Sequence, residues 1–304
     1  MSKRPPAWTE VSVVAPLGWC ELVAEALALG PCTSVAFGAP SLGSEAAPEG
    51  SEHVRTYVPE AEDTPELRAR LTAVLAALAE RTGAEELAGL APRFRHLPPE
   101  DYASSWRKSW RPFRVGDLAV VSPDWRGTPR ARDRVLRLEP GGAFGTGRHP
   151  TTRACLRFLQ GWPLDGARVV DAGTGSGLLA VAAVLWGARE AFGFDVDPHA
   201  VPYAEALADG NGVAERCRFV AADVGCLEAE RESFDALFAN LYADLILAHA
   251  GALARALRRG GRFAVSGCVR ERRAEVEAAL AAAGLEVRAR STRGRWDAFE
   301  GLRT

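Results

Sequence analysis

A glycine-rich segment near the middle of the chain could bind a nucleotide-like ligand. An apolar run ends at Asp171, glycines follow at positions 173, 175 and 177, and a helical pattern begins at Leu178. Glycine allows the backbone to approach a ligand closely and to adopt positive φ. A P-loop would need a lysine that is missing here, and a dinucleotide fingerprint would need a third glycine where Leu178 stands. The remaining alternative is a packing turn without a ligand.

Three polar residues follow the next apolar runs. Asp195 comes 22 residues after Gly173 and could accept hydrogen bonds from both ribose hydroxyls of an adenosine. Asp223 could lie beside the adenine, although an ordinary helix cap is an equal alternative. An apolar run also precedes Asn240, which could orient an amine or could be a turn residue. Ligands of open α/β sheets bind at the carboxyl ends of strands, where these residues are expected.

A second glycine-containing segment, EPGGAFGTGRHPTTRACL at 139–156, precedes an expected helix near Pro150. Backbone amides and threonine hydroxyls at a helix start can contact a polar ligand. For Thr151 and Thr152, simple helix capping is the alternative. His149 has no second His, Cys or carboxylate at ligand spacing, so no metal site is expected.

The N-terminal part of the chain is expected to form a small α+β domain over residues 1–98. The order β-α-β-β-α-β is that of a ferredoxin-like fold. Pro98-Pro99 breaks this pattern, and residues 99–112 are expected to form a linking helix. The expected strands are 11–15, 33–37, 53–58 and 94–97, and the expected helices are 19–29 and 64–81.

Residues 113–304 alternate between strand-like and helical patterns. Repeated β-α units predict a mostly parallel sheet with helices on both faces. Strands are expected at 168–171, 191–195, 218–221, 236–239, 262–266, 285–290 and 296–302. Helices are expected at 178–186, 199–209, 243–258 and 271–283, the third of them ended by Gly260-Gly261.

The composition bounds the class of protein. At 304 residues, 47% hydrophobic and 25% charged, the chain has room for about two globular domains. The formal net charge of −2 gives no overall positive field that would attract nucleic acid. None of the six cysteines forms C-x-x-C, which argues against a zinc ribbon. No signal peptide or membrane-spanning run is recognised, so a cytoplasmic location is expected.

Several of these segments together carry a family resemblance. The spacing G-x-G-x-G after an acidic residue resembles the first motif of class I methyltransferases. With SWRKSWRPFRVG, LEPGGAFGTGRHPTTRACL, VVDAGTGSG, GFDVDPHAV and FANLYADL, the chain resembles the family that methylates large-subunit ribosomal protein eleven, PrmA. The resemblance covers most of residues 101–304, and FGTG-x-HPTT is its most distinctive run. The first hundred residues match in domain pattern more than in sequence.

The resemblance implies an α/β fold, namely the class I methyltransferase doubly wound, mostly parallel seven-stranded sheet, with a smaller N-terminal ferredoxin-like domain that recognises the substrate. It implies that Thr152, Gly173, Asp195 and Asn240 contact S-adenosylmethionine. Gly175 and Asp223 are expected beside them, and the family's G-C-G-S-G reads G-T-G-S-G here, with Thr174.

The resemblance also bears on the acceptor. Amino-group methyltransferases often place an N-x-x-Y type segment where this chain has Asn240-Leu241-Tyr242. Asn240 and Tyr242 are therefore expected to orient the amine, and Tyr242 or Phe144 to line its pocket.

The expected reaction is methyl transfer to lysine side-chain or N-terminal amines of a ribosomal large-subunit protein. A lysine pKa of about 10.4 means that deprotonation costs roughly 4–5 kcal/mol at pH 7. A monomer without direct nucleic-acid binding is expected. One alternative is a class I methyltransferase for another protein, a small amine or RNA. Another is a non-catalytic cofactor- or ribosome-binding protein, and a nicotinamide dehydrogenase is more distant.

Overall fold

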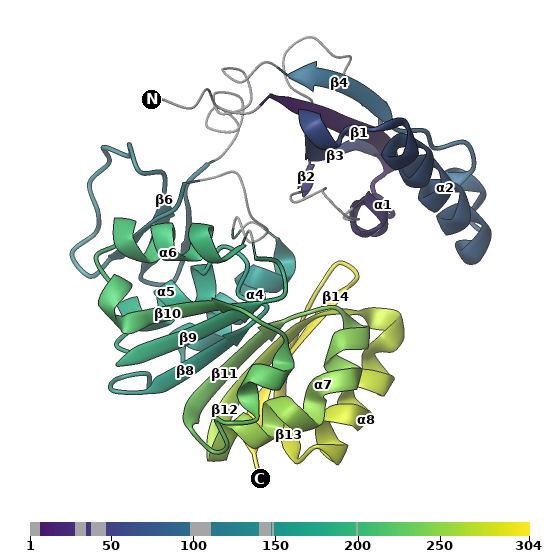
Figure 1. Ribbon diagram of the computed structural model, residues 1–304. Helices are drawn as coiled ribbons and strands as arrows, with labels where there is room; N and C mark the ends of the chain where they lie inside the picture. Colours follow the sequence, from purple (N-terminus) through teal and green to yellow (C-terminus); the bar gives the residue numbers. More distant parts are fainter. Residues whose placement is uncertain are drawn as a thin grey trace. The chain divides into compact units, whose positions relative to one another are not determined.

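The computed structural model describes residues 7–27, 35–37, 47–97, 111–139, 147, 149–198 and 200–304. The chain forms two compact units, and Figure 1 labels their helices and strands. The first, called the N-terminal unit here, comprises Met1–Trp110 and Pro140–Phe144. The second, called the sheet unit, comprises Arg111–Glu139 and Gly145–Thr304. The expected linking helix at 99–112 falls almost entirely outside the described residues.

The N-terminal unit contains an antiparallel four-stranded sheet in the order β2-β3-β1-β4. Helices α1 and α2 follow β1 and β3, so the order along the chain is β-α-β-β-α-β. The elements are β1 (Trp8–Pro16), α1 (Cys20–Leu27), β2 (Val35–Phe37), β3 (Ser51–Pro59), α2 (Pro65–Thr82) and β4 (Arg93–Leu97).

Helix α2 forms where its cap and its leucine spacing predict a helix. The Thr64 hydroxyl accepts the Leu67 amide at 3.3 Å as an N-cap, and Gly83 ends the helix with φ +63°. The helix buries a leucine face that includes Leu71 and Leu75. This face packs with Val11, Val13 and Ala15 of β1 and with Leu27 of α1, so the core of the unit includes one face of the sheet and both helices.

The sheet unit contains a seven-stranded sheet in the order β10-β9-β8-β11-β12-β14-β13. The first five strands of that order are parallel, and β14 is antiparallel to both β12 and β13. The strands are β8 (Arg168–Ala172), β9 (Glu190–Asp195), β10 (Cys217–Ala221), β11 (Phe234–Asn240), β12 (Leu257–Val269), β13 (Leu285–Arg293) and β14 (Trp296–Arg303). The strand order reverses between β8 and β11, which is where open α/β sheets bind ligands.

Helices cover the seven-stranded sheet on both faces, as expected for repeated β-α units (Figure 1). They are α4 (Pro150–Gln160), α5 (Leu178–Leu185), α6 (Ala200–Gly210), α7 (Ala243–Ala256) and α8 (Arg273–Ala282). Val170 and Ala172 of β8 share a buried cluster with Ile246 of α7 and Val276 of α8. Short 3₁₀ turns are η1 (Glu60–Glu62), η2 (Glu85–Leu87), η3 (Ala214–Arg216), η4 (Val224–Leu227) and η5 (Arg270–Arg272).

Two features of the sheet unit differ from the sequence-based expectation. A separate three-stranded sheet of β5 (Phe113–Val115), β6 (Leu118–Val121) and β7 (Arg134–Arg137) precedes α4, and no strand was placed there. The expected helix end at Gly260-Gly261 is wrong, because α7 ends at Ala256 and both glycines lie within β12. The ladder between β11 and β12 is irregular before Ala236, so these glycines belong to an irregular strand and not to a helix cap.

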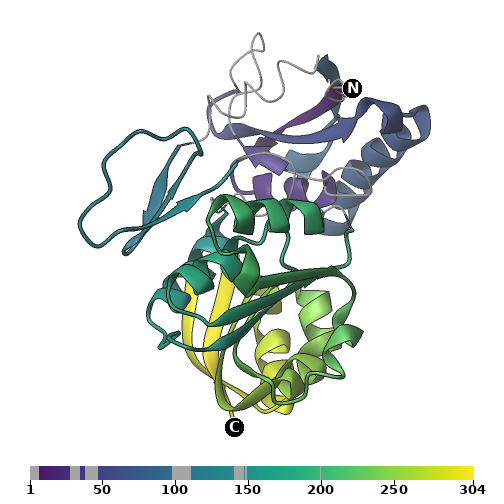
Figure 2. The same ribbon diagram turned by 60° about the vertical axis from the view of Figure 1, so that its left-hand side comes forward.

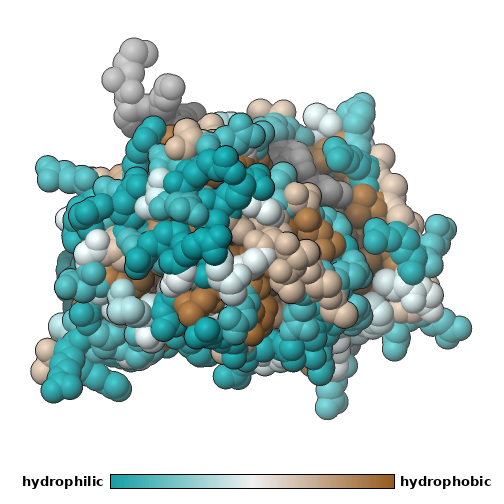
Figure 3. Space-filling model, turned by 90° about the horizontal axis from the view of Figure 1, so that it is seen from below, coloured by the Kyte–Doolittle hydropathy of each residue, from teal (hydrophilic) through white to brown (hydrophobic). Residues whose placement is uncertain are grey.

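The face of the molecule drawn in Figure 3 is mainly hydrophilic, and its hydrophobic areas are limited. Among the described residues, no helix is long and apolar enough to cross a membrane.

The close pairing of β13 with β14 at Gly301 gives a testable prediction. A Cβ at this position would lie 1.9 Å from the Glu286 carbonyl oxygen and 2.8 Å from Phe263 Cε1. We expect Gly301→Ala to lower the free energy of unfolding by about 1–3 kcal/mol, because the strands must separate to admit the methyl group. The matched control is Gly210→Ala, where a Cβ meets nothing within 4 Å. Urea unfolding can be monitored by tryptophan fluorescence. Equal unfolding midpoints for the two variants would contradict this packing.

Candidate cofactor-binding site

The glycine-rich turn between β8 and α5 is held open by positive backbone angles. Gly173, Gly175 and Gly177 have φ values of +71°, +50° and +78°. The amides of Gly173 and Thr174 both donate to the Phe194 carbonyl oxygen, at 2.9 and 3.0 Å. The turn is therefore attached to the neighbouring strand β9 and does not depend on α5 alone for its shape.

Asp171, the acidic residue before the turn, stabilises the turn from inside. Its side chain is buried, and one carboxylate oxygen accepts the Thr174 hydroxyl at 2.9 Å and the Ala180 amide at 3.2 Å. Burial raises the pKa of Asp171 to about 7. The other oxygen has no hydrogen-bond partner among the described residues. The hydroxyl of Thr174, at the position where the family often has cysteine, therefore has a clear structural role.

Asp195, at the end of β9, is brought directly against the turn. One carboxylate oxygen accepts the Gly175 amide at 2.9 Å, and the other accepts the Asp197 amide at 3.0 Å. A carboxylate oxygen has two lone pairs, so each oxygen can still accept one further hydrogen bond. The side chain that the sequence assigns to a ribose therefore has two oxygens suited to a pair of hydroxyls.

Leu241 connects the glycine turn to the end of β11. A Cβ at Gly173 would lie 2.4 Å from Leu241 Cδ2, so any side chain at position 173 would displace this leucine. A Cβ at Gly267 of β12 would lie 2.2 Å from the Leu241 carbonyl oxygen. The residue after Asn240 is therefore confined between the turn and β12, which restricts where Asn240 can lie.

Asn240 and Thr152 meet although they are far apart in the sequence. The Asn240 Nδ2 atom donates to the Thr152 hydroxyl at 3.3 Å. Thr152 lies in the first turn of α4 and is buried, and Asn240 ends β11. This contact joins the segment that contains the HPTT motif to the edge of the sheet that carries the glycine turn.

His149, and not a threonine, caps helix α4. Its Nδ1 accepts the Thr151 amide at 3.4 Å and lies 2.6 Å from the Thr151 hydroxyl. The alternative that Thr151 or Thr152 caps the helix is therefore wrong. Burial lowers the pKa of His149 to about 4, so the imidazole is neutral at pH 7. Its ring packs edge-on against Trp296, with centroids 5.2 Å apart.

The remaining predicted site residues lie at the same edge of the sheet or outside the described residues. The Asp223 carboxylate accepts the Gly225 amide at 2.8 Å as the N-cap of η4, so it has the capping role that the sequence left open. Tyr242 precedes α7, and 41% of its surface is exposed. Phe144 lies outside the described residues, so its expected place in an acceptor pocket is untested.

The arrangement is suited to binding and positioning a polar ligand. Gly173, Asp195 and Asn240 come from the carboxyl ends of three adjacent strands, β8, β9 and β11. Among the described residues, no cluster of three or more His, Cys, Asp or Glu side chains could hold a metal ion. The parts that converge are a carboxylate, an amide, a hydroxyl and a turn without side chains at its glycines.

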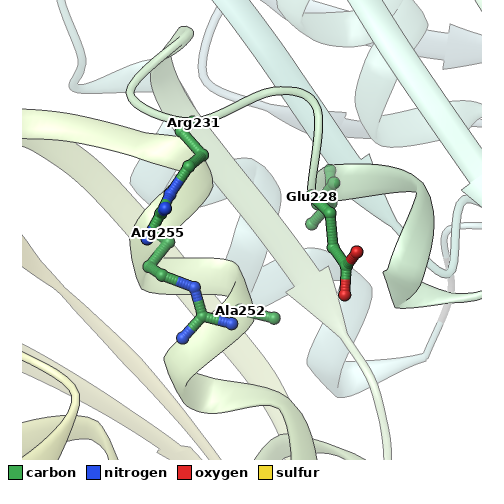
Figure 4. Close-up of a pocket in the computed structure, with 5 residues that line it drawn as sticks. Glu228, Arg231, Ala252 and Arg255 are labelled. Carbon is green, nitrogen blue, oxygen red and sulfur yellow. The ribbon is translucent and has the colours of Figure 1, made fainter.

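Two cavities in the sheet unit involve none of these residues. One, of about 290 Å³, is lined by Leu227, Glu228, Arg231, Ala252 and Arg255, with the arginines on one side and Glu228 across from them (Figure 4). The other, of about 270 Å³, is lined by Asp117, Arg134, Gln160, Trp162 and Trp186. Neither cavity includes the glycine turn or Asp195, so neither is the predicted ligand site.

Sequence reasoning missed the contact of Trp296 with His149. Trp296 was expected only as the first residue of a strand. Strand β14 lies antiparallel between β12 and β13, and it contacts α4. Trp296, at the start of β14, therefore reaches His149. No local pattern encodes that insertion.

Comparisons with known proteins identify the family. The sequence profile of the family described as "Ribosomal protein L11 methyltransferase (PrmA)" matches residues 7–304. A Pelotomaculum thermopropionicum protein named ribosomal protein L11 methyltransferase is 39% identical over 83% of this chain and 79% of its own length. A protein of the same name from Symbiobacterium thermophilum is 40% identical over 76% of this chain and 74% of its own length.

A solved structure agrees with the fold. The ribosomal protein L11 methylase of Lactobacillus delbrueckii subsp. bulgaricus superposes with a TM-score of 0.59 at 26% identity, covering 64% of this chain and 99% of that one. Together with the strand order described above, this likeness confirms the expected class I methyltransferase sheet. The match over residues 7–304 and the relatives at about 40% identity confirm the resemblance seen in the sequence motifs, and the chain belongs to the ribosomal protein L11 methyltransferase (PrmA) family.

Proposed function

We propose that this chain transfers methyl groups from S-adenosylmethionine to lysine side-chain or N-terminal amines of ribosomal protein L11. The observation that carries the proposal is the convergence of the glycine turn, Asp195 and the Thr152–Asn240 pair at one edge of the sheet. Family membership across residues 7–304 supports the reaction and the substrate class.

The residues present fit this cofactor. Asp195 has two oxygens that can each accept a hydrogen bond from a ribose hydroxyl. Gly173 has no side chain, and Leu241 packs against it. Thr152 and Asn240 provide a hydroxyl and an amide for the amino-acid end. Gly175 shapes the turn through its hydrogen bond to Asp195, and Asp223 lies after the next strand, at a position that would suit the adenine.

The chain's own contribution to the chemistry is positioning. Bound S-adenosylmethionine supplies an electrophilic methyl group on a sulfonium. The acceptor must be a neutral amine, and removing its proton costs roughly 4–5 kcal/mol at pH 7 for an ordinary lysine. Desolvation and a nearby positive charge both reduce that cost. Asn240 would orient the amine by accepting a hydrogen bond, and Tyr242 would line its approach.

Recognition of the substrate protein is assigned to the N-terminal part of the chain. We place a recognition domain at residues 1–98, a connecting segment at 99–112 and the methyltransferase domain at 113–304. The N-terminal unit supports this division because it has a core of its own, which includes Val11, Leu27 and Leu71.

The direct test is a transfer assay with radiolabelled S-adenosylmethionine and purified L11. We expect label on L11, and mass spectrometry of ribosomal proteins from a deletion strain should show loss of methyl mass from that protein. Efficient labelling of a different protein, a small amine or RNA, with none on L11, would show that the assigned substrate is wrong.

Asp195→Asn should weaken cofactor binding. The amide has one acceptor oxygen, and its NH₂ group would face the amide of Gly175 or Asp197, donor against donor. We expect the dissociation constant measured by calorimetry to rise about 10- to 100-fold, since hydrogen bonds to charged groups contribute about 1.5–3 kcal/mol. Asp209→Asn on the exposed side of α6 is the control and should bind normally. Equal affinity of both variants for the cofactor would show that Asp195 does not bind it.

Substitutions of Asn240 and of Tyr242 should change different kinetic parameters. We expect Asn240→Ala to lower kcat about 10- to 100-fold, because the loss of orientation acts on the transfer step. Tyr242→Phe keeps the exposed ring and should stay within a fewfold of the parent, whereas Tyr242→Ala should raise KM for the protein substrate. An unchanged kcat for Asn240→Ala, with normal folding by circular dichroism, would refute its catalytic role.

A further inference from the structure

The connection between β6 and β7 is a loop without regular secondary structure. Strand β6 ends at Val121 and β7 begins at Arg134, so the loop comprises residues 122–133. The two strands are parallel, which requires the chain to return along the sheet before it pairs again. Figures 1 and 2 show this loop projecting away from the strands. Parallel strands need a crossover of about a dozen residues, so the pairing explains the length of this loop but not its composition.

This loop has defined anchors at both of its ends. The Asp133 carboxylate accepts two hydrogen bonds from the Arg114 guanidinium, at 2.5 and 2.6 Å, and one from the Arg130 amide at 2.5 Å. The Arg137 guanidinium donates to the Pro123 carbonyl oxygen at 3.1 Å. The two ends of the loop are therefore attached to the small sheet by hydrogen bonds.

The tip of the loop is rich in arginine, and the carboxylates of the loop are Asp124 and Asp133. All residues from Arg126 to Arg132 are exposed. Arg126, Arg130 and Arg132 form no ion pair with a described carboxylate. Asp133 is the acidic group near Arg130, and it is already bound by Arg114. Three guanidinium groups therefore face solvent within seven residues.

An indole lies beside these guanidinium groups. Trp125 is partly exposed, and a Cβ at Gly127 would lie 2.3 Å from its Cζ2 atom. The ring is thus packed over the backbone of Gly127, and only glycine permits that contact. Gly127 therefore helps to hold an aromatic ring in place next to the arginines.

This combination fits a nucleic acid better than a protein. A guanidinium matches the geometry of a phosphate, and an aromatic ring held in place can stack on a base. Protein interfaces also favour Trp and Arg, but they need an apolar centre. From Trp125 to Arg132 the apolar side chains are Trp125, Pro129 and Ala131, which are too few to form such a centre. The net charge of −2 for the whole chain does not oppose this, because salt screens charges more than about 10 Å apart.

We propose that loop 122–133 is a binding surface for single-stranded or loop RNA. Arg126, Arg130 and Arg132 contact phosphates, and Trp125 stacks on a base. The loop shares no residue with the cofactor site, so it acts on affinity for an RNA-containing form of the substrate and not on methyl transfer to the free protein.

The test compares two triple variants in fluorescence anisotropy with a labelled single-stranded RNA of about 20 nucleotides. R126Q/R130Q/R132Q should bind at least tenfold more weakly than the parent at about 50 mM salt. The slope of log affinity against log salt concentration should be shallower by about two for this variant, since each phosphate contact contributes about 0.7 to that slope. Trp125→Ala should also weaken binding several-fold, and Trp125→Phe should bind like the parent.

R231Q/R255Q/R259Q is the matched control, because these exposed arginines also lack ion pairs with described residues and lie elsewhere in the sheet unit. It should bind RNA within twofold of the parent. Equal losses in the two triple variants, or no RNA binding by the parent, would overturn the proposal. Displacement of RNA by polyglutamate at equal charge concentration would instead assign the loop to an acidic protein partner. Methyl transfer to free L11 by the loop variant should remain normal, which separates this test from that of the proposed function.

Discussion

The attachment of the glycine turn to strand β9 is the constraint on which the site depends. The Gly175 amide donates to Asp195, and the amides of Gly173 and Thr174 donate to the Phe194 carbonyl oxygen. These hydrogen bonds require β8 and β9 to be parallel neighbours whose carboxyl ends are level, as the pairing of Ala172 with Phe194 provides. Without that register, the turn and the carboxylate could not act on one ligand.

The opposite side of the site is fixed by packing. The Leu241 side chain fills the space beside Gly173, and its carbonyl oxygen lies close to Gly267 of β12, so the end of β11 has little freedom. Asn240 then lies where its amide reaches Thr152 of α4. The edge where the strand order reverses is thus bounded by a carboxylate on β9 and an amide on β11, with the turn between them. Polar groups in this order along the edge suit a ligand that has a ribose at one end and a polar amino-acid group at the other.

The sequence predicted what local patterns encode. The glycine spacing and Asp195 predicted the strand-turn-helix unit, and the predicted bounds of its strand and helix agree with the structure within a residue or two. Helix α2 followed from its cap at Thr64 and its leucine spacing. The mistakes arose where the tertiary structure overrides a local signal: Gly260-Gly261 reads as a helix stop but lies within an irregular strand.

Other features could not be derived from single segments. The order β12-β14-β13, which places Trp296 against His149, depends on pairing between distant strands. His149 caps α4 in place of the threonine that was the alternative, and its imidazole can accept a hydrogen bond because burial keeps it neutral. The three short strands before α4 carry too few residues for a periodic pattern to identify them.

The most direct measurement is a crystal structure of the full chain with bound S-adenosylhomocysteine. The account predicts the ribose hydroxyls on the Asp195 carboxylate and the backbone of the glycine turn beside the ligand. It also predicts the homocysteine end next to Thr152 and Asn240. A ligand bound elsewhere, with Asp195 making only its contacts to the amides of Gly175 and Asp197, would contradict the central claim that these groups form one site.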